Sequence, residues 1–270
     1  MCLRFGVTCC GYRYLAFSGL PADPEFDTRH VCIMDNTLSE PIIFQHKCEE
    51  HILSMRVTPD YLLLAFHQHV ELWDISGKQL IKSFSTGLNI HAPCDITNDF
   101  TVMAFAGEDP MNIRAFFVSE QKMTEFKAAD DTVSLMKFSP TGTYLATTST
   151  DGKIVQVFDT KNHICIGKFK RGHMSSVIHS IDFSPNGDFM AIISQNGTLH
   201  FFDLRIRKSS TISAFHRITI GALVLSQISW YSPSQIAVMT MKGEMINIAI
   251  DPETCHEVGR EQKVFYKSFF

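Results

Sequence analysis

The sequence predicts an all-β protein, a β-propeller of WD40-like four-stranded blades. Two neighbouring segments repeat: Phe138 corresponds to Phe183, 45 residues later, and Asp159 to Asp203, 44 residues later. This is the period of a propeller blade. Short β-rich stretches separated by turn residues fill each repeat, and no apolar stripe of helical period continues over about ten positions.

The clearest unit covers residues 133–170. Strands are expected at 144–148, 154–158 and 164–169 because these stretches are rich in β-branched and aromatic residues. Turn signals stand before and between these strands, at Pro140–Gly142, Asp151-Gly152 and Lys161-Asn162. The aspartates that follow the third strands, Asp159 and Asp203, are expected to tie turns through their carboxylates.

Fainter copies fill the rest of the chain, and one contains the Trp73-Asp74 pair. We predict a single propeller domain, residues 1–270, with six recognisable blades at about 12–46, 52–86, 92–128, 133–170, 177–218 and 223–258. Residues 1–11 and 261–270 are too short for a blade of their own, and we expect them at most to supply strands that close the ring.

Composition favours a folded protein with a local binding site. Hydrophobic residues make up 45% of the chain and charged residues 19%, which argues against disorder. The net charge of −4 gives no global attraction to nucleic acid or anionic membranes, so an anion site must be a local patch. The eight cysteines are scattered without a C-x-x-C pair, as expected for reduced cytosolic thiols.

Neither a membrane span nor a catalytic motif is predicted. No apolar run reaches the roughly 18 residues of a spanning helix, and the N-terminus lacks the order of a signal peptide. Nucleophile-elbow, phosphate-loop and zinc-protease motifs are absent. We therefore expect a cytoplasmic protein without catalytic residues, cofactor or metal, whose membrane contact is peripheral.

One motif stands out at the junction of the two clearest units: Phe169-Lys170-Arg171-Gly172. Arginine offers a planar set of donors that matches two phosphate oxygens, lysine adds a point charge, and glycine allows close approach of the backbone. The motif therefore indicates a phosphate site. The alternative is a solvated, charged strand end.

With its flanks, the motif resembles the PROPPIN family of phosphoinositide-binding β-propellers. The strand Ile154–Thr160 precedes it and Gly197–Phe202 follows, in the family's order. The likeness is strong over about 140–204 and weaker from about 12 to 260. It begins at the family's second blade, so the first of seven expected blades is missing from this chain.

The resemblance implies a peripheral membrane protein that binds phosphatidylinositol 3-phosphate or the 3,5-bisphosphate. Such a protein recruits autophagy scaffold proteins during autophagosome assembly and catalyses no reaction. Recruitment to pre-autophagosomal, endosomal, or vacuolar and lysosomal membranes is expected, without nucleic-acid partners. The alternative function is a WD-repeat scaffold that has lost lipid binding and acts through protein contacts.

The family has two lipid pockets, one on each side of the motif. The stronger is implied at Arg171, Ser194, Thr198 and His200, whose guanidinium, hydroxyl and imidazole groups all bind phosphate. The alternative for Thr198 and His200 is capping of a hairpin. If His200 contacts phosphate, binding is expected to tighten between about pH 7.5 and 6.

The second pocket departs from the family pattern and is expected to be weaker. It retains Ser149 and has Lys170 and Lys153 where the family has arginine and threonine, so bidentate geometry is lost. The membrane-inserting loop is also reduced, to a short connection containing Arg205, Ile206, Arg207 and Lys208. This connection contacts an anionic membrane weakly, or is simply a polar hairpin.

Overall fold

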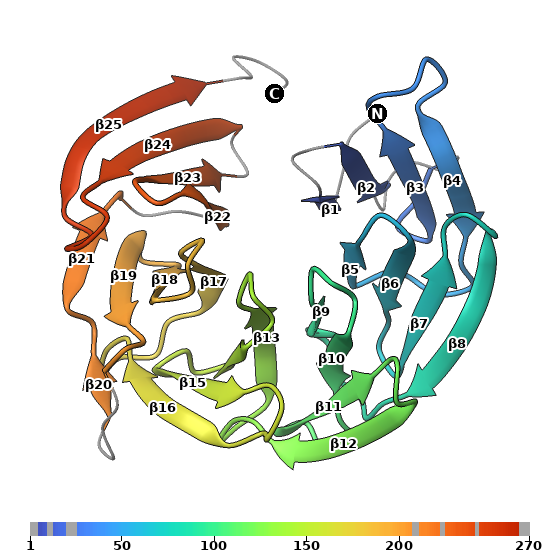
Figure 1. Cartoon of the computed structure of the whole chain (residues 1–270), viewed down its shortest axis with the longest axis horizontal. Helices are drawn as coiled ribbons and strands as arrows, with labels where there is room; N and C mark the ends of the chain where they lie inside the picture. Colours follow the sequence, from blue (N-terminus) through green and yellow to red (C-terminus); the bar gives the residue numbers. More distant parts are fainter. Residues whose placement is uncertain are drawn as a thin grey trace. The chain divides into compact units, whose positions relative to one another are not determined.

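The computed structural model describes residues 5–9, 13–19, 26–206, 211–221, 225–240 and 243–264, and all regular structure within them is β-strand. The chain forms two compact units, Met1–Lys127 and Ala128–Phe270. The described residues of each unit form three sheets of four antiparallel strands, and one sheet of the second unit gains a fifth, parallel strand (Figure 1).

The first unit holds three sheets. The first contains β1 (Phe5–Cys9), β2 (Tyr14–Ser18), β3 (His30–Asp35) and β4 (Ile42–Lys47). The second contains β5 (Ser54–Val57), β6 (Tyr61–Ala65), β7 (His69–Asp74) and β8 (Gln79–Ser85). The third contains β9 (Cys94–Ile96), β10 (Val102–Ala106), β11 (Asn112–Phe117) and β12 (Lys122–Lys127).

The second unit repeats this plan. Its first sheet contains β13 (Val133–Phe138), β14 (Tyr144–Ser149), β15 (Ile154–Asp159), β16 (Cys165–Lys170) and the short β20 (Ile212–Ser213). The next contains β17 (Ile178–Phe183), β18 (Phe189–Ser194), β19 (Thr198–Asp203) and β21 (His216–Thr219). The last contains β22 (Ser226–Ser232), β23 (Gln235–Thr240), β24 (Glu244–Ile250) and β25 (Glu257–Val264).

Neighbouring sheets of a unit bury apolar side chains between them. In the second unit, the faces of the β13–β16 and β17–β19 strands share a core that contains Val157, Phe169, Ile192 and Phe202. The Phe169 and Phe202 rings meet edge to face at a centroid distance of 5.6 Å. First strands of successive sheets also contact one another, β5 with β9 and β13 with β17, as blades of a propeller do.

The turns confirm the role predicted for the repeated aspartates. The Asp159 carboxylate accepts hydrogen bonds from the backbone N–H groups of Lys161 and Asn162 at 3.0 and 2.8 Å. Asp203 accepts one from the backbone N–H of Arg205 at 2.9 Å. These carboxylates satisfy donors that the strand ladder leaves unpaired.

The predicted fold class, all-β with four-stranded propeller blades, is confirmed. Part of the segment 1–11 forms a strand, because Phe5–Cys9 pairs with Tyr14–Ser18 and so belongs to the first sheet. Residues Glu257–Val264 form the fourth strand of the last sheet. The single domain of residues 1–270 stays a prediction.

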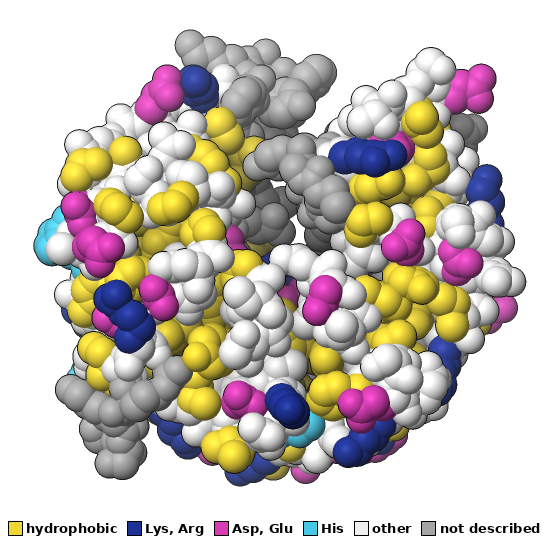
Figure 2. All heavy atoms as spheres, in the orientation of Figure 1, with side chains coloured by type: hydrophobic (Ala, Val, Ile, Leu, Met, Phe, Trp, Pro, Cys, Tyr) yellow, Lys and Arg dark blue, Asp and Glu magenta, His cyan; other side chains and the backbone are white. Residues whose placement is uncertain are grey.

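The surface carries charges of both signs. In the view of Figure 2, basic and acidic side chains lie near one another at several separate places. Among the described residues, no helix has the length and hydropathy required to cross a membrane.

Candidate functional site

The signature motif sits at the end of β16, where alternation of side chains separates its two cations. Phe169 is fully buried against Phe202. Extended pairing continues one residue past the strand, because the Arg171 backbone N–H donates to the Lys153 carbonyl at 2.8 Å. Successive residues of a strand point to opposite faces. Arg171 therefore shares the face of Phe169, and Lys170 lies on the other.

Arg171 is buried, with only 6% of its surface exposed. Its Nε donates to the Gly152 carbonyl at 2.7 Å, and its Nη2 donates to the Met174 carbonyl. No ion pair joins it to a carboxylate within the described ranges. Burial lowers the pKa of Arg171, and the charge of Asp151 opposes this shift. The site therefore holds a buried guanidinium whose described partners are neutral carbonyls.

Pairing of β18 with β19 brings the other predicted residues to the same side. Ile192 lies opposite His200 in the register, so Ser194, two residues after Ile192, shares the face of Thr198, His200 and Phe202. That face meets Phe169 on β16. The structure thus brings together Arg171, Ser194, Thr198 and His200, which we call the Arg171 site.

Two polar atoms of the Arg171 site have no hydrogen-bond partner among the described residues. Ser194 is fully buried and His200 is 6% exposed, and the unpartnered atoms are Ser194 Oγ and His200 Nδ1. A buried polar atom without a partner costs free energy of about 1–3 kcal/mol. Such atoms next to a cation suit a ligand that supplies oxygen acceptors.

His200 is also electrostatically perturbed. Burial, together with the charges of Arg217 and Arg171, lowers its pKa to about 4. The imidazole of the ligand-free protein is therefore neutral between pH 7.5 and 6. The pH window predicted from the sequence stays a prediction, because it depends on the pKa of His200 when phosphate is bound.

Two residues of this region were missed by the sequence reasoning. Arg217 on β21 lies directly opposite His200 in the register, is exposed, and has no described partner. Ser176 precedes β17, and its buried Oγ also lacks a partner among the described residues. Neither belongs to the motif, and no local sequence signal marks them. The β19–β21 pairing alone places Arg217 beside the site.

The predicted weaker site, on the Lys170 side of the motif, already contains the carboxylate of Asp151. Ser149 Oγ donates to Asp151 Oδ1 at 2.9 Å, and Lys153 Nζ lies 3.5 Å from Asp151 Oδ2. Burial raises the pKa of Asp151, but hydrogen bonds from the Lys153 backbone N–H and Ser149 Oγ, with the charge of Lys153, leave it below its usual value. Two of the three predicted ligands of the weaker site, Ser149 and Lys153, thus bind an internal anion.

Comparisons with known proteins find relatives by sequence and by fold. The family model "WD domain, G-beta repeat" matches residues 120–156 and 164–203. Autophagy-related protein 18e of Arabidopsis thaliana is 24% identical over 181 residues, which are 66% of this chain and 46% of that protein. The first curated relatives are covered over 45–60% of their length.

Solved structures show the same fold. The crystal structure of Kluyvelomyces marxianus Hsv2 superposes with a TM-score of 0.75 at 18% identity, over 92% of this chain and 81% of that one. The structure titled "Complex of KlAtg21 with coiled-coil of AgAtg16" gives a TM-score of 0.77 at 16% identity, over 92% and 81% of the two chains. These similarities support the resemblance to the PROPPIN family.

The shortened loop is partly described. Arg205 forms an ion pair with Asp203 at 2.9 Å and lies over the Phe189 ring, 4.7 Å from its centroid. Ile206 is 38% exposed. Arg207 and Lys208 lie outside the described residues, so the membrane contact of the loop stays a prediction. After the loop, Ile212 and Ser213 pair in parallel with Phe169 and Lys170.

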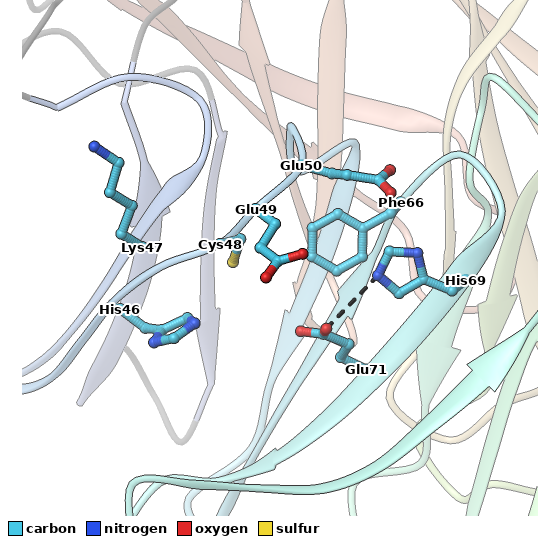
Figure 3. A pocket seen from close by; sticks show the side chains of 8 residues that line it. All are labelled: His46, Lys47, Cys48, Glu49, Glu50, Phe66, His69 and Glu71. Carbon is cyan, nitrogen blue, oxygen red and sulfur yellow. Dashed lines mark ion pairs between the residues drawn. The ribbon is translucent and has the colours of Figure 1, made fainter.

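The protein also has a cavity of about 260 Å³ in its first unit, away from the motif in sequence. The residues that line it are His46, Lys47, Cys48, Glu49, Glu50, Phe66, His69 and Glu71. Figure 3 shows Glu49 and Glu50 turned toward the Phe66 ring, with Lys47 pointing away. Three carboxylates around an aromatic ring suit a cationic side chain. No group of three or more metal-ligating side chains occurs in the described part of the chain.

Proposed function

We propose that this protein is a peripheral membrane propeller that binds a phosphoinositide, phosphatidylinositol 3-phosphate or the 3,5-bisphosphate, at the Arg171 site. It acts as a scaffold in autophagosome assembly and catalyses no reaction. Its place is the cytoplasm, with recruitment to pre-autophagosomal, endosomal, or vacuolar and lysosomal membranes.

One observation carries the proposal: a buried cation faces buried, unpartnered polar atoms. Arg171 has no carboxylate partner in the described structure, and Ser194 Oγ and His200 Nδ1 have no hydrogen-bond partner there. A phosphate monoester would supply about two negative charges and three acceptor oxygens. The Arg171 guanidinium would make bidentate hydrogen bonds to the phosphate, and the hydroxyls of Ser194 and Thr198 would donate hydrogen bonds from the facing strands.

Arg217 is a further candidate ligand of the phosphate. It lies beside His200 on the exposed strand β21, so its guanidinium is available to a phosphate that approaches from solvent. An exposed arginine also increases the rate of encounter with an anionic membrane, an effect that falls with added salt.

The partners that we propose are autophagy scaffold proteins. A relative of the same fold was solved as a complex with the coiled coil of AgAtg16, and other relatives are named autophagy-related proteins. These names support a role in autophagosome assembly for this chain.

Vesicle flotation tests the lipid assignment. Wild type is expected to float with phosphatidylcholine vesicles that contain phosphatidylinositol 3-phosphate at low salt, and not with vesicles that lack it. Arg171→Ala is expected to lose most of this binding, because a charge-assisted pair contributes about 2–5 kcal/mol when one partner is removed.

Matched variants exclude unfolding as the cause. Arg171→Lys keeps the charge but loses the bidentate geometry, so an intermediate loss is expected. Arg29→Ala removes an arginine that pairs with Asp27 in the first unit and should float like wild type. Circular dichroism and thermal unfolding check each fold. Equal flotation of Arg171→Ala and wild type rules out the Arg171 site.

The second candidate function is a scaffold without lipid binding. The carboxylate-lined cavity of the first unit favours it, because Glu49, Glu50 and Glu71 around Phe66 suit a cationic side chain of a protein partner. The same flotation experiment separates the two. Failure of a folded wild type to float at low salt supports the scaffold alone.

A further inference from the structure

The turn that connects β16 to β17 carries two exposed apolar side chains beside the Arg171 site. Residues 172–177 read Gly-His-Met-Ser-Ser-Val. Met174 is 78% exposed and Val177 is 51% exposed. Single exposed apolar residues are common on protein surfaces, so position and attachment decide whether these two have a role.

This turn is fixed to the site by hydrogen bonds. The Met174 carbonyl accepts from Arg171 Nη2. The Ser176 backbone N–H donates to the Asp151 carbonyl at 3.1 Å, and the Val177 carbonyl accepts from the Gln195 backbone N–H at 2.9 Å. Gln195 follows Ser194 directly. The turn is therefore tied both to the guanidinium and to the strand end that carries the unpartnered hydroxyl.

We propose that this turn is a membrane-contact element, in which Met174 and Val177 enter the interfacial layer of the bilayer whose head group occupies the Arg171 site. The inference rests on the proposed lipid function. A head group bound at Arg171 remains attached to its bilayer, so the surface next to Arg171 must face lipid. Met174, whose own carbonyl is bonded to that guanidinium, belongs to this surface.

Charge and chemistry of the turn agree with a lipid surface. Its six residues include no aspartate or glutamate, so an anionic bilayer meets no repulsion from the turn itself. Lys170 and Arg171 directly precede it. Apolar side chains next to cations are the combination by which peripheral proteins hold an anionic interface. Methionine is flexible and adapts to an irregular apolar environment.

Tryptophan fluorescence tests the contact directly. Met174→Trp retains the bond to Arg171, because the acceptor is the backbone carbonyl. The two native tryptophans, Trp73 and Trp230, are at most 9% exposed and provide a constant background. The vesicles contain phosphatidylcholine, phosphatidylinositol 3-phosphate and, in one arm, phosphatidylcholine with brominated acyl chains.

The same strand supplies a matched control. Ile164 is 63% exposed and directly precedes β16, so it lies at the opposite strand end from Arg171. A six-residue strand separates the two ends by about 20 Å. Ile164→Trp therefore reports on a side chain of similar exposure in the same sheet. We expect brominated lipid to quench the added tryptophan of Met174→Trp and to leave that of Ile164→Trp unquenched.

The outcomes separate this inference from the proposed function. If both variants float and the added tryptophan of Met174→Trp is not quenched, the membrane-contact turn is wrong while the Arg171 site stands. If folded wild type fails to float, the proposed function fails and the inference fails with it. Quenching in both variants also overturns it, because the contact would not be specific to the turn.

A second measurement replaces the two exposed apolar residues of the turn by aspartate. Met174→Asp with Val177→Asp is expected to reduce binding to these vesicles about tenfold or more, through lost apolar burial and added repulsion. The double variant should lose much less affinity for soluble inositol 1,3-bisphosphate than for the vesicles, because Arg171, Ser194 and His200 are retained and only the added repulsion acts on the soluble ligand. Ile164→Asp should leave both measurements unchanged. Unchanged vesicle binding by the double variant contradicts the proposal.

Discussion

Proton binding by His200 should be coupled to head-group binding. In the ligand-free protein its pKa is lowered to about 4 by burial and by Arg217 and Arg171. A bound phosphate cancels the positive potential and accepts a hydrogen bond from the imidazolium, so the pKa rises. The complex then holds this proton more tightly than the free protein does. Binding must strengthen as pH falls through the window between the bound and free pKa values.

The size of this effect follows from the two pKa values. If phosphate restores His200 to its ordinary pKa of about 6.5, the dissociation constant falls about 20-fold between pH 7 and pH 5, or roughly 1.8 kcal/mol. In the same range the ligand-free fold loses about 2 kcal/mol of stability, because the unfolded chain binds the proton at about pH 6.5 and the native state does not. Circular dichroism must therefore show a folded protein at pH 5.

Calorimetric titration with inositol 1,3-bisphosphate measures the coupling. The phosphate groups themselves take up protons near pH 6, which weakens binding to any variant. His200→Gln keeps a hydrogen-bond donor and cannot titrate, so it shares this loss. The ratio of the two dissociation constants, His200→Gln over wild type, isolates the imidazole. It should rise about 20-fold from pH 7 to pH 5, and a constant ratio would remove His200 from the site.

Four further predictions concern single side chains of the second unit. Ser194→Ala should weaken head-group binding about three- to tenfold and raise the free energy of unfolding of the ligand-free protein by about 1–3 kcal/mol, because it removes a buried hydroxyl that has no described partner. Thr147→Ala should do the reverse and destabilise the fold by about 1–3 kcal/mol in urea titration, because its Oγ1 donates to a buried carbonyl at 2.6 Å; the opposite pattern in this pair would refute the site. Asp151→Asn should release Lys153 and raise the calorimetric stoichiometry from one head group toward two, and an unchanged stoichiometry contradicts this. Phe169→Ala should cost about 3–5 kcal/mol of stability in the same urea titration, since the ring is fully buried, and a loss below about 1 kcal/mol would show that the core collapses around the change.

Much of the fold could be predicted from local signals. The repeated Phe138 and Phe183 lie at corresponding ends of β13 and β17, and Asp159 and Asp203 close equivalent turns. These features depend on a few neighbouring residues, so the sequence displays them directly. The pairing of Ile212 with Phe169 could not be predicted in this way. It joins residues 43 positions apart through a two-residue strand with no periodic pattern.

The Arg171 site was predictable to the extent that its residues belong to one motif and one hairpin. Arg171, Ser194 and His200 converge because strand alternation fixes their faces. Arg217 and Ser176 reach the same place through pairing between strands and through a turn, which residue types alone do not indicate. Reading Ser149 as a phosphate ligand overlooked Asp151, whose carboxylate already accepts the Ser149 hydroxyl.

Asp151 affects how the amount of membrane-bound protein should depend on the surface density of the lipid. A protein with two competent sites is retained in proportion to the square of the lipid density, because the second contact forms at high effective concentration. If the Arg171 site binds lipid as proposed, the contacts of Asp151 with Ser149 and Lys153 leave one head group held per molecule. Occupancy of a membrane then follows lipid density linearly, and long residence requires a second attachment point, supplied by a protein partner or by the turn at Met174.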